Sequence, residues 1–115
     1  QRNQRVMTRI TFHLSQNGQI AAVDLSGHAG YAEEGEDIVC AAVSSAVQLT
    51  HALLFDVQKI PVDALIEEDG AHIRLTLPAQ MLDKGQDAMR ALRIFYTELA
   101  SQYPDFLCIA QPVNV

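Results

Sequence analysis

The chain has 115 residues, of which 49% are hydrophobic, and its eight basic and fourteen acidic residues give a net charge of −6. This length fits one domain, which we expect to occupy residues 7–115. Binding to nucleic acid requires clustered Lys and Arg, so the acidic balance argues against direct nucleic-acid contact and favours a basic protein partner. We expect no apolar run to approach the ~20 residues of a membrane span, and therefore no membrane contact.

The two cysteines, Cys40 and Cys108, do not form the disulfide framework of a small secreted protein. Without a secretory leader they predict reduced thiols in a cytoplasmic protein, with Cys108 inert in an apolar strand. Residues 1–6 precede Met7, and the segment that Met7 opens has the character of a natural start. We therefore expect residues 1–6 to be a remnant of expression.

The first half of the chain reads as two strands and a helix. Apolar and polar side chains alternate over residues 10–14, and Asn17-Gly18 then provides the residues that a tight hairpin turn favours. Residues 19–28 form the returning strand. Asp37 is the expected N-cap of a helix that runs from residue 38 to about residue 59.

The second half repeats this order. Residues 62–68 and 71–77 predict a hairpin about Asp69-Gly70, and a second helix runs from residue 83 to residue 102. A last short strand is expected over residues 106–111. The side chains expected to face the core are Ile73, Leu75 and Leu77 in the hairpin and Ala88, Leu92, Phe95 and Leu99 in the helix.

The repeated order of elements predicts the fold class. Two ββα units and a closing strand indicate an α+β domain in two layers, with both helices packed on one face of a mixed sheet.

A histidine and a cysteine stand twelve positions apart around a glycine-rich acidic loop. His28 lies at the end of the second strand, and Cys40 falls in the first turn of the helix if Asp37 is its cap. A thiol attacks only after it loses its proton, and a nearby imidazole and the N–H groups of a helix N-terminus both lower its pKa. His28 and Cys40 therefore have the chemistry of a base and a nucleophile. The residues alone also allow a buried structural cysteine and an ordinary strand-end histidine.

The other three histidines are poor partners for Cys40. His51 shares the first helix, but eleven residues at ~1.5 Å each place it ~16 Å away along the axis. His13 and His72 fall on polar-facing strand positions, where an exposed histidine is the ordinary expectation.

Acidic residues crowd the loop that joins His28 to Cys40. Such a cluster attracts a basic peptide, and it also raises the pKa of the histidine and opposes thiolate formation. Two glycines bracket the loop and permit hinge movement, which predicts a lid that closes on substrate. The loop residues expected to bind substrate or to form the lid are Gly30, Tyr31, Glu33, Glu34, Gly35 and Glu36.

Two further residues support the site. A carboxylate can orient a catalytic imidazole, but an aspartate directly before a helix more often caps it, so we interpret the site as a dyad in which Asp37 arranges the helix start. Ser44, one turn beyond Cys40, either bonds to substrate or packs the helix. The spacing of His and Cys fits no metal site, and no cofactor is expected.

The motif carries a family resemblance. Gly27-His28-Ala29-Gly30, followed by the run from Gly35 to Ser44 that contains Asp-Ile-Val-Cys-Ala-Ala-Val-Ser, resembles the signature of the bacterial ribosomal-processing cysteine proteases, the Prp family. The resemblance implies that Cys40 and His28 are catalytic, with Gly27 part of the signature. It also implies a homodimeric endopeptidase that removes an N-terminal extension from the large-subunit ribosomal protein numbered twenty-seven, cutting after an aromatic residue.

One alternative function remains at this stage. A non-enzymatic module that binds a ribosomal protein or an assembly factor through its acidic loop would carry the same charge and would leave Cys40 buried. The rate at which iodoacetamide alkylates Cys40 distinguishes the two, because only a catalytic thiol reacts rapidly near neutral pH.

Overall fold

The computed structural model describes residues 7–27, 34–67 and 72–115. The elements follow one another in this order: β1 (Thr8–Leu14), β2 (Ile20–Ser26), α1 (Glu34–His51), the π-helical turn η2 (Ala52–Val57), β3 (Asp63–Ile66), β4 (His72–Thr76), the 3-10 turn η3 (Ala79–Met81), α2 (Leu82–Gln102), β5 (Leu107–Ile109) and β6 (Val113–Asn114). The repeated ββα order is the predicted one, and β6 is an addition that the sequence pattern did not indicate.

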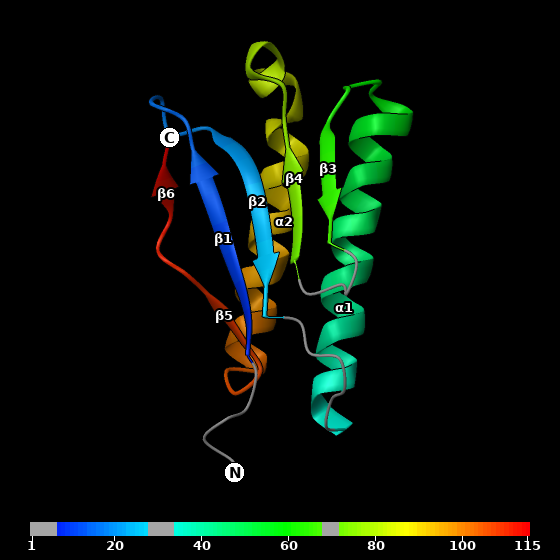
Figure 1. Ribbon diagram of the computed structural model, residues 1–115, viewed down its shortest axis with the longest axis vertical. Coiled ribbons are helices and arrows are strands. Elements are labelled where there is room, and N and C mark those ends of the chain that lie inside the picture. Colours follow the sequence, from blue (N-terminus) through cyan, green and yellow to red (C-terminus); the bar gives the residue numbers. More distant parts are fainter. Residues whose placement is uncertain (1–6, 28–33, 68–71) are drawn as a thin grey trace.

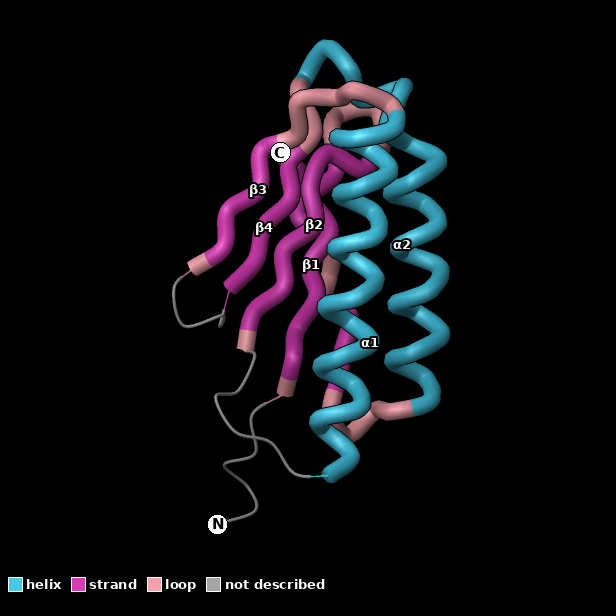
Figure 2. Tube along the Cα trace, turned by 90° about the vertical axis from the view of Figure 1, so that its right-hand side faces the viewer, coloured by secondary structure: helices cyan, strands magenta, loops and turns pink. Residues whose placement is uncertain are grey.

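The strands form one mixed sheet in the order β3-β4-β2-β1-β5, with β6 also paired to β1. The pairs among β3, β4, β2 and β1 are antiparallel, whereas β5 and β6 run parallel to β1. Figure 2 shows the sheet as one layer and both helices as a second layer on the same face. The predicted two-layer α+β class is therefore confirmed.

The core lies between the two layers, and alternation along the strands decides which side chains enter it. Phe12, Val23 and Leu75 lie side by side on the helix-covered face and are almost fully buried. Burial of one such side chain contributes about 1.5–3 kcal/mol. The first helix contributes its own apolar stripe, formed by Val39, Val43 and Val47 of α1 and continued by Leu54 of η2.

The buried face of α2 differs from the predicted one at a single aromatic position. Ala88, Leu92 and Leu99 are buried as expected, but Phe95 is 45% exposed and Tyr96 is fully buried in its place. The Tyr96 hydroxyl donates a hydrogen bond of 2.7 Å to the Val43 carbonyl oxygen. Because a buried hydroxyl needs a partner, only the packing of α2 on α1 makes this burial favourable.

α1 is more apolar than the sequence pattern suggested. The stretch Ile38–Val57 has a mean hydropathy of 1.8 and, by length and composition alone, could cross a membrane. The expectation that no run approaches this length was therefore wrong. One side of this stretch packs into the core, whereas Ile38 and Leu49 are 57% and 71% exposed. The two-layer fold thus uses one side of the apolar helix and leaves a second apolar surface uncovered.

Candidate active site

α1 places Cys40 in its second turn. The helix begins at Glu34, so Cys40 is its seventh residue, and its side chain is half-buried. The predicted start after an Asp37 cap was wrong, because Asp37 already lies within the helix. Glu34 and Glu36 also fall in the first turn, where the positive end of the helix dipole favours acidic residues.

The earlier helix start changes the electrostatics expected at the thiol. Only the first four N–H groups of a helix lack an intrahelical acceptor, and in α1 these belong to residues 34–37. The N–H group of Cys40 falls beyond them, and the effect of the dipole fades within the first turn. The helix N-terminus therefore stabilises a Cys40 thiolate less than the sequence suggested. A nearby imidazole would have to supply more of that stabilisation.

Cys40 and Ser44 lie on one flank of α1, which we call the Cys40 flank. Successive helix residues are turned by about 100°. The buried stripe through Val39 and Val43 faces the sheet, and Leu49 lines the groove toward α2. At this rotation Cys40 and Ser44 fall on the opposite side of the stripe from α2. The half-buried thiol and hydroxyl are therefore at the border between core and surface.

Gly27 turns the chain out of β2 immediately before the predicted base. Its φ of 82° lies in the left-handed region that other residues rarely adopt. A Cβ atom at this position would also run into the backbone carbonyl oxygen of Met7. The structure therefore explains why glycine precedes His28, since no larger residue fits at position 27 between the end of β2 and the start of β1.

The predicted base and half of the predicted loop fall outside the residues that the structure describes. These are His28, Gly30, Tyr31 and Glu33. The backbone of Glu34, Gly35 and Glu36 is helical, so the acidic segment expected to be loop up to Asp37 is part of α1 from Glu34 onward. The dyad itself therefore stays a prediction.

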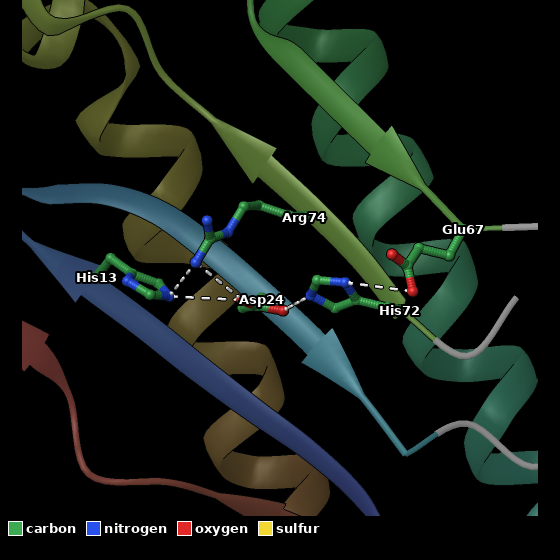
Figure 3. A network of polar contacts seen from close by, with 5 residues as sticks. All are labelled: His13, Asp24, Glu67, His72 and Arg74. Carbon is green, nitrogen blue, oxygen red and sulfur yellow. Dashed lines mark hydrogen bonds and ion pairs between the residues drawn. The ribbon is translucent and has the colours of Figure 1, made fainter.

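His13 and His72 belong to a polar cluster on the open face of the sheet, the face away from the helices (Figure 3). Asp24 is its centre: the carboxylate contacts His72, forms an ion pair of 3.0 Å with Arg74 and lies 3.6 Å from Nε2 of His13. Arg74 also lies 3.1 Å from Nε2 of His13, and Glu67 is 3.9 Å from Nδ1 of His72. The side chains of His13 and His72 are only 13% and 28% exposed, so the expectation of exposed histidines was wrong.

The position of this cluster separates two histidines from the thiol. Side chains alternate along a strand, and the helix-covered face carries Phe12 and Val23, the neighbours of His13 and Asp24. The sheet therefore stands between these histidines and the helix layer that holds Cys40. His51 is also engaged elsewhere, because its ring stacks on Phe55 with centroids 5.3 Å apart.

Within the described ranges, no group of three or more His, Cys, Asp or Glu side chains is placed to hold a metal ion. The described part of the candidate site consists of a half-buried thiol on the Cys40 flank of α1 and a glycine that turns the chain at the end of β2. Cys108 lies in β5 and is half-buried rather than fully enclosed.

The sequence of the whole domain has a family match. Residues 7–108 match the family described as cysteine protease Prp. This chain belongs to that family, since the match covers most of its length and includes both Cys40 and His28. No curated protein matches the chain significantly.

Solved structures agree with the family assignment. The crystal structure of SMU.848 from Streptococcus mutans is 29% identical and superposes with a TM-score of 0.84, covering 95% of this chain and 99% of that one. The ribosomal processing protease Prp from Staphylococcus aureus, solved with a substrate peptide, is 18% identical with a TM-score of 0.82, covering 90% and 98%. The same S. aureus protease with a covalently linked product peptide has a TM-score of 0.78 at 18% identity, covering 95% and 100%. At these low identities the S. aureus likeness establishes the shared fold.

Proposed function

We propose that this chain is a cytoplasmic cysteine endopeptidase that removes the N-terminal extension of the large-subunit ribosomal protein numbered twenty-seven. The observation that carries the proposal is the Prp family match over residues 7–108, which spans the Gly27-His28 pair and Cys40. The protease assignment favours this function over a non-enzymatic binding module. The S. aureus relative is described as a ribosomal processing protease and was solved with peptides, one of them covalently linked.

The proposed reaction uses Cys40 as nucleophile and His28 as base. His28 takes the thiol proton, and the thiolate sulfur forms a bond to the scissile carbonyl carbon. The peptide C–N bond then breaks, and the imidazolium returns its proton to the leaving amine. Water, deprotonated by His28, hydrolyses the thioester and restores the thiol. Each bond made to sulfur is thus broken again within one turnover, and no cofactor is consumed.

The substrate class follows from charge and from the family. The chain carries a net charge of −6, and acidic residues crowd the segment between His28 and Cys40. A positively charged peptide is drawn to such a region, and its charge offsets the repulsion that the acids exert on a thiolate. We therefore expect a basic precursor peptide with an aromatic residue before the cleaved bond.

The proposed enzyme is a homodimer. Leu49, Leu53 and Phe95 are large apolar side chains on α1, η2 and α2 that are 71%, 40% and 45% exposed, and a groove of about 400 Å³ separates the two helices beside Phe95. Exposed apolar surface of this kind favours association, and a second copy of the chain would cover it. Sedimentation velocity tests this arrangement: Leu49→Glu should shift a dimer to monomer, whereas an unchanged sedimentation coefficient would place the interface elsewhere.

Cleavage of a synthetic peptide with the proposed features tests the reaction. Cys40→Ala and His28→Ala should each lower kcat by orders of magnitude, because a nucleophile and its base act as a unit. Cys108→Ala removes the other thiol and should cleave like the parent protein. Thermal melting of all three variants separates lost chemistry from lost folding. Cleavage at the parent rate by either dyad variant, or a loss that follows unfolding, would contradict the assignment.

A further inference from the structure

One edge of the sheet is left open in the described part of the chain. β3 ends the strand order and pairs only with β4. All four of its residues are exposed, including Leu65 at 45% and Ile66 at 66%. Proteins usually protect such an edge with Lys, Pro or a covering segment, because it is a template for pairing with another chain. β3 contains neither Lys nor Pro.

The hydrogen bonds to β4 identify the backbone groups that the open edge presents. The N–H group of Glu67 donates to the His72 carbonyl oxygen at 3.0 Å, which makes these two residues a hydrogen-bonded pair. Hydrogen-bonded and non-hydrogen-bonded pairs alternate along an antiparallel ladder. Leu65 therefore also directs its N–H and C=O groups at β4. Ala64 and Ile66, the residues between, therefore direct their N–H and C=O groups at the open edge.

The open edge lies on the side of the molecule that carries the thiol. Figure 1 shows α2 behind the middle of the sheet and α1 behind its β3 side, and it shows β3 running toward the end where α1 begins. The Cys40 flank of α1 points away from α2, hence toward this side. Ile66 shares the helix-covered face with its partner Ile73, yet it is mostly exposed. No described side chain fully covers Ile66 at the place where a peptide would pass toward the helix layer.

We propose that the open edge of β3 binds an extended segment of the peptide substrate as an additional strand, a binding mode that deepens the proposed peptidase function and rests on it. Ala64 and Ile66 supply the backbone hydrogen bonds, and Ile66 offers an apolar contact to alternate substrate side chains. Asp63 is the first residue of β3 and Glu67 directly follows its last, and both are exposed. Their charges complement a basic peptide, which is the substrate class expected here.

A second copy of the chain is a poorer occupant of this edge. Antiparallel pairing of two β3 strands about a twofold axis would bring Asp63 of one copy close to Glu67 of the other. Like charges on paired strands are destabilising, so the charges at Asp63 and Glu67 oppose pairing of two copies at this edge. A basic segment lacks this penalty, so the charges at Asp63 and Glu67 favour a basic peptide over a second β3 strand at this edge.

Residue-resolved amide hydrogen exchange of Cys40→Ala protein tests the proposal with its own internal control. The probe is a synthetic peptide that carries an aromatic residue flanked by lysines, which this variant binds without cleaving. The amides of Ala64 and Ile66 should exchange rapidly in the unbound protein and slow by about fivefold to tenfold on binding. The amides of Leu65 and Glu67 bond to β4 in both states and should change less. Bound peptide with no added protection at Ala64 and Ile66 would overturn the edge site and leave the peptidase function standing.

Kinetics with edge variants give a second readout. Ile66→Pro removes an outward N–H group but no bond to β4, a change that edge strands tolerate. It should raise KM by about fivefold to tenfold with little change in kcat, whereas Ile66→Ala keeps the N–H group and should raise KM less. Equal KM values for the two variants would contradict backbone pairing. Failure of the parent protein to cleave or bind any basic peptide would overturn the proposed function, and the edge site with it.

Discussion

Tyr96 joins the two helices through one buried hydrogen bond, and replacing it with Phe removes that bond without emptying the core. The side chain is fully buried, and its hydroxyl donates to the Val43 carbonyl oxygen at 2.7 Å. Phe fills almost the same volume, and the Val43 carbonyl keeps the acceptor role that the helix gives it. The free energy of unfolding should therefore fall by about 1 kcal/mol at neutral pH, the net contribution of one hydrogen bond.

The pH dependence of this difference is the sharper part of the prediction. Burial raises the pKa of Tyr96 well above its ordinary value of 10.0. The unfolded chain releases the hydroxyl proton near that ordinary value, whereas the folded chain retains it. The folded state then binds more protons, so its stability falls as the pH rises above 10. The loss is about 1.4 kcal/mol for each further pH unit until the pKa of the folded state is reached.

Urea denaturation followed by circular dichroism, at steps from neutral to about pH 11, measures both proteins under conditions that alter their other groups equally. The parent protein should be the more stable below pH 10, and its advantage over Tyr96→Phe should vanish near pH 11. A difference in unfolding free energy that stays constant over this range would refute the buried, neutral hydroxyl.

Three further predictions concern the site and the sheet. Gly27→Ala should lower the unfolding free energy by more than the ~1–2 kcal/mol that a left-handed backbone costs a residue with a Cβ atom. Gly18→Ala, at a φ of 81° with open space around it, should lose only that amount. Equal melting temperatures would contradict the close approach of residue 27 to the Met7 carbonyl oxygen. Asp24→Asn should lose about 1–2 kcal/mol in urea denaturation because it leaves an arginine and two histidines without their carboxylate, and the exposed Asp63→Asn should lose almost nothing; equal losses would show that the cluster contributes little. A basic peptide should be cleaved faster than its acidic variant, with an advantage that shrinks as salt is added, and equal rates at low ionic strength would remove the electrostatic argument.

The order and type of the elements were predictable because local signals determine them. Asn17-Gly18 indicates a hairpin, and the strand alternation around it decides which side chains reach the core. The start of α1 was not predictable to the same degree. Asp37 is a good cap by residue type, but three acidic residues also fit the first turn of a helix that begins at Glu34, and the local sequence does not choose between these starts.

Long-range contacts account for the remaining differences. Tyr96 is buried in place of Phe95 because its hydroxyl reaches a carbonyl on α1, a partner that lies 53 residues earlier in the chain. Asp24 on β2 contacts His13 on β1 and His72 on β4, and no spacing in the sequence predicts these contacts. The proposed roles of Cys40 and His28 rest on the sequence motif and the family match, whereas the structural reason for Gly27 required the position of Met7 beside it.

Mass spectrometry of protein quenched in acid during turnover tests the central claim, that Cys40 is the nucleophile of a peptidase, most directly. A basic peptide with an internal aromatic residue is mixed with the protein, and the quenched protein is digested and mapped. A thioester between Cys40 and the N-terminal part of the substrate, ending at the aromatic residue, is the predicted result, with Cys108 unmodified. Cleavage with no adduct on Cys40, or an adduct on Cys108 instead, would contradict the account.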